Sequence, residues 1–367
     1  MPIRFLTILS VFALVFAACA GGGAEETSTT SQPVEATTTV APTPEAMLLS
    51  YSLEPGSTLT YEVDMDQSIV MSVDGDASAL GDGEEIPAEM DLSIAGSTTF
   101  THEVAEGPEP GTYAITITGD LSDLQVTGTM DDEPVSRGDI PDLAGMEPVE
   151  VTIVVDEKGN VIPDESNLGE GLDFFGGLGG FDMLENMGPG AGGSAGQFIG
   201  PPFTEEEVTV GDSWSETVEI PTLPGDDPIL THIDSEVVGT DVIDGAGVLV
   251  IETTTATSAI EFDLAEILIG FMTAFLPEDA TPEEQAEMDA MVEQLRFAFS
   301  IDPTASEMTT WFDFEAGLSR QADFLNTTHL IMDIKVPDED TGDLVEMALD
   351  MTVAQDITYR LLDAGSA

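Results

Sequence analysis

The amino-acid sequence predicts a mainly β protein of the α+β class, built on one large curved antiparallel sheet or half-barrel of long strands. Three observations support this fold class. Apolar and polar residues alternate over stretches far longer than an ordinary strand, glycine-containing turns separate these stretches, and a helical pattern breaks the series at 262–299. Clean alternation buries one face of a sheet and leaves the other in water, and a sheet this wide must twist and curve.

Residues 1–18 predict a lipoprotein signal peptide. Arg4 is their only charge, and the apolar run 5–18 is shorter than the roughly 20 residues of a membrane-spanning helix. Two alanines then precede Cys19, the only cysteine of the 367 residues, so no intramolecular disulfide is expected. This arrangement resembles the lipobox of bacterial lipoproteins. The resemblance implies cleavage before Cys19, lipid such as palmitate on that residue, and an extracytoplasmic protein anchored to the membrane or envelope of a bacterial cell.

Residues 19–47 comprise this cysteine and a Thr-, Pro- and Glu-rich tether that has almost nothing to bury, and we expect the tether to be disordered. A first β-meander half is predicted over 48–168, with later strands around 90–104, 113–121 and 149–155. Its first strand places apolar side chains on one face at Leu59, Tyr61, Val63, Met65, Ile69, Met71 and Val73. This strand greatly exceeds the usual length of about five residues.

A glycine-rich connection, predicted over 169–205, carries more large apolar side chains than a polar linker would. Two interpretations stay open. The stretch is either a mobile flap that closes a hydrophobic cavity or an irregular connection whose side chains pack on the core. The candidate cavity residues from this stretch are Phe174, Phe175, Leu178 and Phe181.

The second β-meander half is predicted over 206–363, followed by a short tail at 364–367. Its strands are expected around 214–220, 233–238, 248–255, 308–314 and 324–334. A last long alternation places apolar side chains at Val345, Met347, Leu349, Met351, Val353, Ile357, Tyr359 and Leu361. The two halves open alike, with Gly56-Ser57-Thr58-Leu59 and Gly211-Asp212-Ser213-Trp214, which predicts that they are copies of one duplicated module.

A helical hairpin is predicted as an insertion in the second half, over 262–299. Residues 262–276 are apolar nearly all round at helical spacing, and Thr281, Pro282 and Glu284 supply an N-cap, a first-turn proline and a capping-box carboxylate. We expect the hairpin to cover the concave, apolar face of the sheet. The candidate cavity residues from the hairpin are Leu268, Phe271, Met288, Met291 and Leu295.

The chain is strongly acidic, with 72 Asp and Glu against 7 Lys and Arg and a net charge of −65. Such a surface excludes nucleic acid as a partner and disfavours electrostatic binding to anionic lipid headgroups. Because 42% of the residues are hydrophobic, the chain is still able to bury a large core. We interpret the charge as a halophilic or marine solvation shell whose repulsion is screened at high salt.

No sequence pattern favours catalysis, a cofactor or a metal. The three histidines, His102, His232 and His329, lack the spacing of a zinc site, and a lone strand histidine is expected to be structural. The run 211–215 lacks the second glycine of a nucleophile elbow, and neither a P-loop nor a dinucleotide fingerprint is present. We therefore expect a protein that is not an enzyme and that holds no cofactor and no metal.

The features above, taken together, resemble those of bacterial lipoproteins that share a "vGdsW" strand opening and, more remotely, LolA/LppX-type half-barrel lipoproteins. The resemblance covers roughly residues 48–363. It implies a cavity between curved sheet and helices that binds or carries a lipid or another hydrophobic ligand. The alternative is a structural or interaction module on the cell surface, in which the helical hairpin plugs the sheet and no small-molecule ligand binds.

Overall fold

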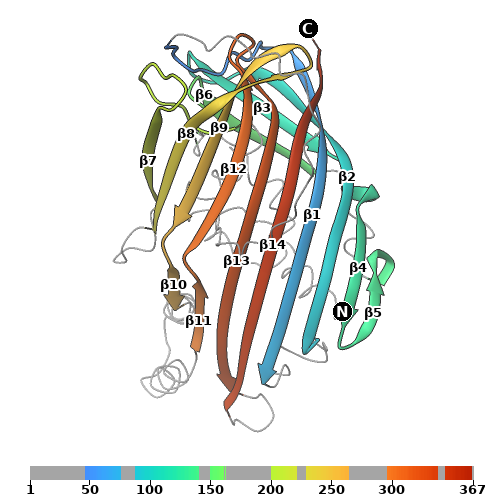
Figure 1. Cartoon of the computed structure of the whole chain (residues 1–367). Helices are drawn as coiled ribbons and strands as arrows, with labels where there is room; N and C mark the ends of the chain where they lie inside the picture. The colour runs from blue at the N-terminus through green and yellow to red at the C-terminus, as the bar shows by residue number, and fades with distance from the viewer. Residues whose placement is uncertain are drawn as a thin grey trace, which may run out of the picture.

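The computed structural model describes residues 46–75, 87–139, 149–160, 162, 200–220, 229–263, 296–337 and 344–365. Over these residues, long strands form one large, open and curved antiparallel sheet (Figure 1). The mainly β, antiparallel fold class predicted from the sequence is thereby confirmed. The longest strand has 22 residues.

The first half of the chain contributes β1 (Thr58–Gly75), β2 (Glu89–Glu106), β3 (Thr112–Gly119), β4 (Gln125–Met130), β5 (Glu133–Ser136) and β6 (Val149–Asp156). The second half contributes β7 (Ser213–Ile220), β8 (Ile229–Ile243), β9 (Ala246–Thr257), β10 (Ile260–Asp263), β11 (Arg296–Ile301), β12 (Thr304–Asp313), β13 (Leu318–Pro337) and β14 (Leu344–Gly365). Two 3-10 helices, η2 (Leu121–Asp123) and η3 (Arg137–Asp139), flank β4 and β5.

The sheet has a central band of four long strands, in the order β2-β1-β14-β13, and a forked margin on each side. On one side, β2 pairs with β3 through residues 100–106 and with β4 through residues 90–95. On the other side, β13 pairs with β12 through residues 318–325 and with β11 through residues 330–335. Each margin therefore has an upper arm and a lower arm, in the orientation of Figure 1.

The alternation predicted for the first and last long strands is confirmed by burial and register. Ile69 and Met71 of β1 are buried, whereas Val70 between them is 49% exposed. The antiparallel ladder pairs Ile69 with Val353 and Met71 with Met351 of β14, both buried as well. Opposed residues of an antiparallel pair point to the same face. The two predicted apolar stripes therefore lie side by side on the concave face.

The two halves of the chain open with the same hydrogen bonds. Gly56, at a φ of 90°, donates its N–H to the carbonyl of Val104 at 2.7 Å, and Gly211, at a φ of 95°, donates to that of Val237 at 2.7 Å. In each half the valine N–H then donates to the carbonyl of the residue that follows the glycine, at 3.0 Å. Each half also inserts strands before a fourth strand pairs back on the third, β6 on β3 and β12 on β9. Duplication of one module stays a prediction that this likeness favours.

The helical hairpin predicted over 262–299 is wrong at both of its ends. Residues 260–263 and 296–301 form β10 and β11, which pair with each other, and β11 also pairs with β13. Phe299 ends the predicted helical stripe, yet it also lies two residues before Ile301, and both are buried as a strand face requires. The part of the hairpin between these strands lies outside the described residues. In the described ranges there is no α-helix, and no helical segment has the length and apolar character needed to cross a bilayer.

Buried side chains of the concave face form two hydrophobic clusters. The upper cluster comprises Leu49, Tyr51, Leu53, Leu59, Tyr61, Val63, Phe100, Val104, Ile115, Ile117, Ile153, Val155, Phe203, Val208, Val237, Leu249, Ile251, Met308, Phe312, Leu318, Ala322, Phe324, Ile357, Tyr359 and Leu361. The lower cluster comprises Ile69, Met71, Met90, Leu92, Ile94, Leu124, Val126, Ile229, Ile260, Phe299, Ile301, Leu330, Leu349, Met351 and Val353.

Candidate functional site

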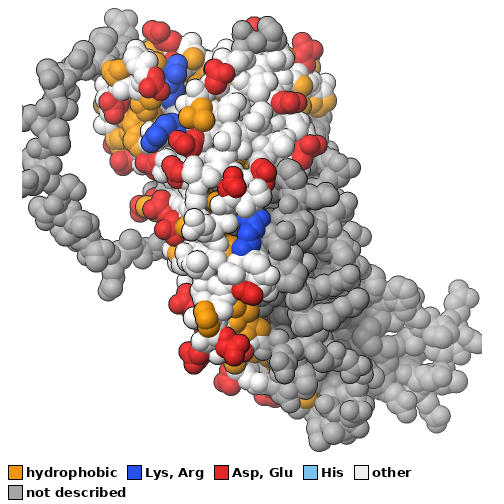
Figure 2. Space-filling view, turned by 90° about the vertical axis from the view of Figure 1, so that its right-hand side faces the viewer, with side chains coloured by type: hydrophobic (Ala, Val, Ile, Leu, Met, Phe, Trp, Pro, Cys, Tyr) orange, Lys and Arg blue, Asp and Glu red, His pale blue; other side chains and the backbone are white. Residues whose placement is uncertain are grey.

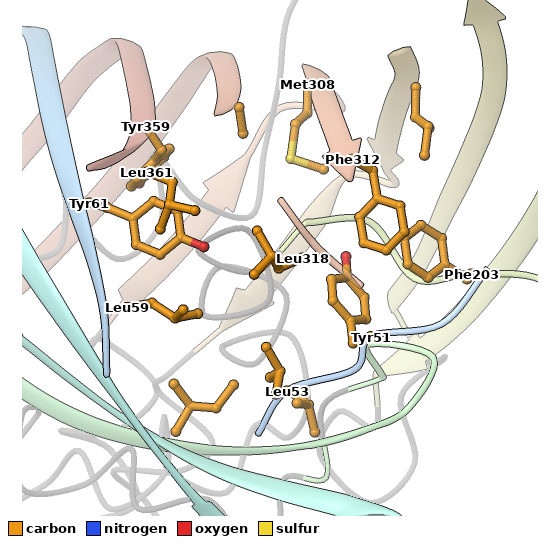
Figure 3. Close-up of a cluster of buried hydrophobic side chains, with 14 of the residues drawn as sticks. Tyr51, Leu53, Leu59, Tyr61, Phe203, Met308, Phe312, Leu318, Tyr359 and Leu361 are labelled. Carbon is orange, nitrogen blue, oxygen red and sulfur yellow. The ribbon is translucent and has the colours of Figure 1, made fainter. Parts of the chain in front are cut away.

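The upper cluster is filled by two connecting segments of the chain, 47–53 and 200–208, which we call the plug. Tyr51 stacks on Phe203 with ring centroids 4.7 Å apart, and both rings meet Phe312 of β12 edge-on, at 5.5 and 4.7 Å (Figure 3). The Tyr51 hydroxyl donates to the carbonyl of Pro201 at 3.0 Å. Aromatic rings in such arrangements bury large apolar areas. The protein therefore packs the upper half of its sheet with its own side chains.

Backbone hydrogen bonds tie the plug to the turns that follow β6 and β12. Tyr51 donates its N–H to the carbonyl of Glu157 at 2.8 Å, and Ser52 donates to that of Gly317 at 2.9 Å. At Gly317, whose φ is 67°, an added Cβ would lie 2.5 Å from the Ser52 Cβ. Glycine is required at this turn both by its backbone conformation and by the closeness of the plug.

One cation holds the two plug segments together. The Lys158 ammonium, in the turn after β6, donates to the carbonyl of Leu49 at 3.0 Å and to that of Thr204 at 3.3 Å. Lys158 also accepts the Phe203 N–H on its own carbonyl at 2.8 Å. Lys158 is one of only 7 basic residues in the chain, and its charge stabilises the packing of the plug.

A small cavity remains beside the plug, between Tyr61, His102 and Ser319. It has room for about one water molecule. Burial lowers the pKa of His102 to about 3, so its ring is neutral, and it lies 4.7 Å from the ring of Tyr61. The Tyr61 hydroxyl donates to the Ser319 carbonyl at 3.1 Å, and burial raises its pKa. The expectation that His102 is structural fits this environment, and the cavity is too small for a lipid.

A row of three amide side chains separates the two clusters. Gln67 of β1 is paired in register with Gln355 of β14, which is paired in register with Asn326 of β13. We call these three residues the polar row. Gln67 is 0% exposed and Asn326 is 4% exposed. At one margin the row lies opposite Ile94 of β2, near the upper end of the β4 pairing. At the other margin Asn326 falls between the β12 and β11 pairings of β13.

Both ends of the polar row lack hydrogen-bond partners. The Nε2 and Oε1 atoms of Gln67, and the Nδ2 and Oδ1 atoms of Asn326, are buried and bond to nothing in the described part of the chain. A buried polar group without a partner destabilises a protein by roughly 1–3 kcal/mol. These four atoms therefore favour a bound polar group between the two clusters.

Hydroxyl side chains continue this polar level toward the second half of the sheet. Thr304 of β12 pairs in register with Thr257 of β9, and both are buried. The hydroxyls of Ser235 and Thr253 lie 3.0 Å apart on neighbouring strands. The Thr304 Oγ1 is buried and has no partner among the described residues. An uncharged polar zone thus crosses the concave face between two apolar ones.

The lower cluster differs from the upper one in its origin. Apart from Leu124, which precedes β4, its members all belong to strands of the sheet. In the described ranges Leu124 is its one member from a connecting segment, whereas the plug contributes Leu49, Tyr51, Leu53, Phe203 and Val208 to the upper cluster. The lower cluster is thus one apolar face of the sheet, next to the polar row.

The sequence-predicted site residues lie outside the described residues. This holds for Cys19 and for the cavity candidates Phe174, Phe175, Leu178, Phe181, Leu268, Phe271, Met288, Met291 and Leu295. The structure therefore tests neither the lipidation site nor the choice between flap and packed connection. Sequence reasoning missed the polar row. Its signal is present in the alternation, because Gln67 and Gln355 each interrupt an apolar stripe without breaking its period of two.

A few charged side chains of the described residues form ion pairs. Acidic side chains are scattered over the face shown in Figure 2, with few basic ones among them. Asp313 is buried and lies 2.7 Å from Arg320. On the convex face, His329 contacts Asp302 at 2.6 Å and Asp350 at 2.9 Å. Within the described ranges, no group of three or more metal-ligating side chains is close enough to hold an ion.

Comparison with known proteins gives no family. No family model matches the chain, and a search of curated proteins finds no match. Among solved structures, the outer membrane protein OprG from Pseudomonas aeruginosa is similar at a TM-score of 0.19 and 5% identity, over 84% of this chain and 98% of that one. OccK5 (OpdH) from the same organism is similar at a TM-score of 0.19 and 5% identity, over 83% and 99%. Scores this low carry no argument about fold or function.

Proposed function

We propose that this protein is a membrane-anchored envelope lipoprotein, not an enzyme, that binds or carries a lipid or other hydrophobic ligand on the concave face of its sheet. One observation carries the ligand-binding part. The upper cluster is filled by the plug, whereas the described members of the lower cluster belong, apart from Leu124, to the strands of the sheet. The Cys19 motif carries the anchoring part, since lipid chains on a cysteine hold a protein at a membrane.

Ligand binding is tested on the full chain carrying Cys19→Ser, purified from the soluble fraction without detergent. Native mass spectrometry and solvent extraction then report any lipid that copurifies. We expect bound lipid in this protein and little in a variant with Leu349→Asn, which places an amide in the lower cluster. The matched control is Leu325→Asn on the convex face, where Leu325 is 49% exposed. It should keep the lipid.

Absence of copurifying lipid from the Cys19→Ser protein, together with failure to bind added lipid, would contradict the proposal. The alternative, a structural or interaction module without a ligand, would then hold. The anchor is tested separately by fractionation, because Cys19→Ser should release the chain from membranes. If this variant stays membrane-bound, the lipoprotein assignment is wrong whatever the ligand result.

A further inference from the structure

The polar row narrows the class of ligand that the proposed function calls for. We propose that Gln67 and Asn326 bind an uncharged hydrogen-bonding group of a neutral acyl ester, such as the ester carbonyl and a free hydroxyl of an acylglycerol. The acyl chain of this ligand lies along the lower cluster. This inference rests on the proposed function and adds where the polar part of the ligand sits and why it is neutral.

The chemistry of the two amides selects the ligand group. Each amide offers both a donor and an acceptor and carries no charge, and all four of these atoms on Gln67 and Asn326 are buried without a partner in the described part of the chain. A group that complements them must itself accept and donate. An ester beside a hydroxyl does both, whereas a hydrocarbon does neither and would leave the amides unpaired.

The charges of the protein argue against an anionic ligand such as a fatty acid. A buried carboxylate needs a cation or strong donors close by. Lys158 bonds to plug carbonyls, Arg320 pairs with Asp313, and Lys335 pairs with Glu346. Arg360 lies 3.9 Å from Glu62, on the outward parity of β14, and Arg137 bonds to carbonyls beside β4. These five are the Lys and Arg side chains that the structure describes, and all are engaged away from the polar row, so a neutral ligand is favoured.

The spacing of the row suits a ligand with more than one polar centre. Gln67 and Asn326 are two strands apart, with Gln355 between them, which places their backbones about 10 Å from each other. Below the row, the apolar face of β1 extends six residues further, from Gln67 to Val73, or about 20 Å. A glycerol backbone bridging the amides and a long acyl chain descending along Ile69 and Met71 fit these dimensions.

The test compares three probes that share one chain length: monopalmitoylglycerol, palmitate and hexadecane. The protein is the full chain with Cys19→Ser, freed of bound lipid on a hydrophobic resin. We expect it to bind monopalmitoylglycerol more tightly than the other two. The double variant Gln67→Leu/Asn326→Leu should lose about tenfold or more of its affinity for monopalmitoylglycerol and change its affinity for hexadecane by less than about threefold. The control Gln125→Leu replaces an exposed glutamine on β4 and should bind like the parent.

The outcomes separate the two proposals. If the double variant binds monopalmitoylglycerol like the parent, the amides do not hold the ligand and this inference is wrong, while ligand binding itself stands. If the parent binds none of the three probes, the proposed function fails first. A second measurement needs no variant: the infrared carbonyl band of a carbon-13-labelled ester should shift to lower frequency on binding, as a hydrogen-bonded ester does. An unshifted band in the bound state would also overturn the inference.

Discussion

The upper and lower halves of the concave face are made by the same four central strands, yet they are completed differently. Above the polar row, Tyr51 and Phe203 of the plug pack against Phe312. Below it, the cluster is composed of sheet residues and Leu124 beside β4, in the described ranges. The difference shows that alternation in a strand determines which face is buried but not what buries it. The proposed function rests on this difference, with packing of the core in the upper half and the proposed ligand in the lower half.

The largest effect on stability is expected from removing an aromatic side chain of the plug. Tyr51→Ala removes a ring that is 2% exposed, its stacking on Phe203 and its hydrogen bond to Pro201. We expect a loss of about 3–5 kcal/mol in the free energy of unfolding. Denaturant titration measures it. Leu48→Ala, three residues earlier and 56% exposed, is the control and should change stability by less than about 0.5 kcal/mol.

A matched pair of leucines compares the two clusters directly. Leu249 of the upper cluster and Leu349 of the lower cluster are both nearly inaccessible, at 1% and 0%. Each substitution to alanine should lower the free energy of unfolding by about 2–5 kcal/mol in the protein as purified. Under the proposed function, removal of copurifying lipid should lower the cost of Leu349→Ala and leave that of Leu249→Ala the same, because the proposed ligand contacts only Leu349 of the two. Equal costs before and after lipid removal at both positions would abolish the distinction between the clusters.

The approach of the plug to the β12 turn is tested by two glycines that share a positive φ. Gly245→Ala introduces only backbone strain, since no atom lies within 4 Å of the new Cβ, and should cost about 1–2 kcal/mol. Gly317→Ala adds a clash with Ser52 and should cost roughly 1–3 kcal/mol more. Thermal unfolding of both variants gives the difference. Similar melting temperatures would mean that the plug shifts at Ser52 and relieves the clash.

The convex face touches neither cluster. Its His329 should make a small, pH-dependent contribution to the stability of the protein. The hydrogen bond to Asp302, followed by that to Asp350, raises the pKa of His329. A raised folded-state pKa stabilises the protein below the unfolded value of about 6.5, and the gain is lost as the pH rises through the folded pKa. His329→Gln should therefore lower stability near pH 5 by less than about 1 kcal/mol and leave it unchanged near pH 9. Loss at both pH values would point to packing instead.

The smallest expected effect is a gain in stability, from the substitution Asp356→Asn. Burial, and then the neighbouring carboxylates of Asp323 and Asp66, raise the pKa of Asp356 on the convex face. Asp66 lies directly opposite Asp356 on the next strand, and like charges so placed repel. Asp356→Asn should stabilise the protein by about 0.5 kcal/mol at neutral pH. The gain should shrink between about 0.1 M and 1 M NaCl, where salt screens the repulsion. A gain unaffected by salt would contradict the screening argument.

The strands were predictable from the sequence because burial of one face imposes a period of two, as the paired stripes of β1 and β14 show. The plug was not, since Tyr51 meets Pro201 across 150 residues and no local pattern encodes such a contact. The helical prediction failed at Phe299, whose spacing fits both periods. For the candidate site, Gln67 and Gln355 were visible as polar residues within apolar stripes. Their meaning depends on register, which places them opposite each other.

The contact between Met47, at the end of the predicted tether, and Val208 has a mechanical consequence. Met47 and Val208 exchange two backbone hydrogen bonds, at 3.0 and 2.8 Å, and the chain then enters the plug. A pulling force on the residues before Met47 is therefore loaded onto the plug and not onto the long strands. Under tension from a membrane, the Met47–Val208 bridge would part first, and Tyr51 would be drawn out before any central strand is sheared. The plug would thus unfold before the long strands when force is applied from the side of the proposed anchor.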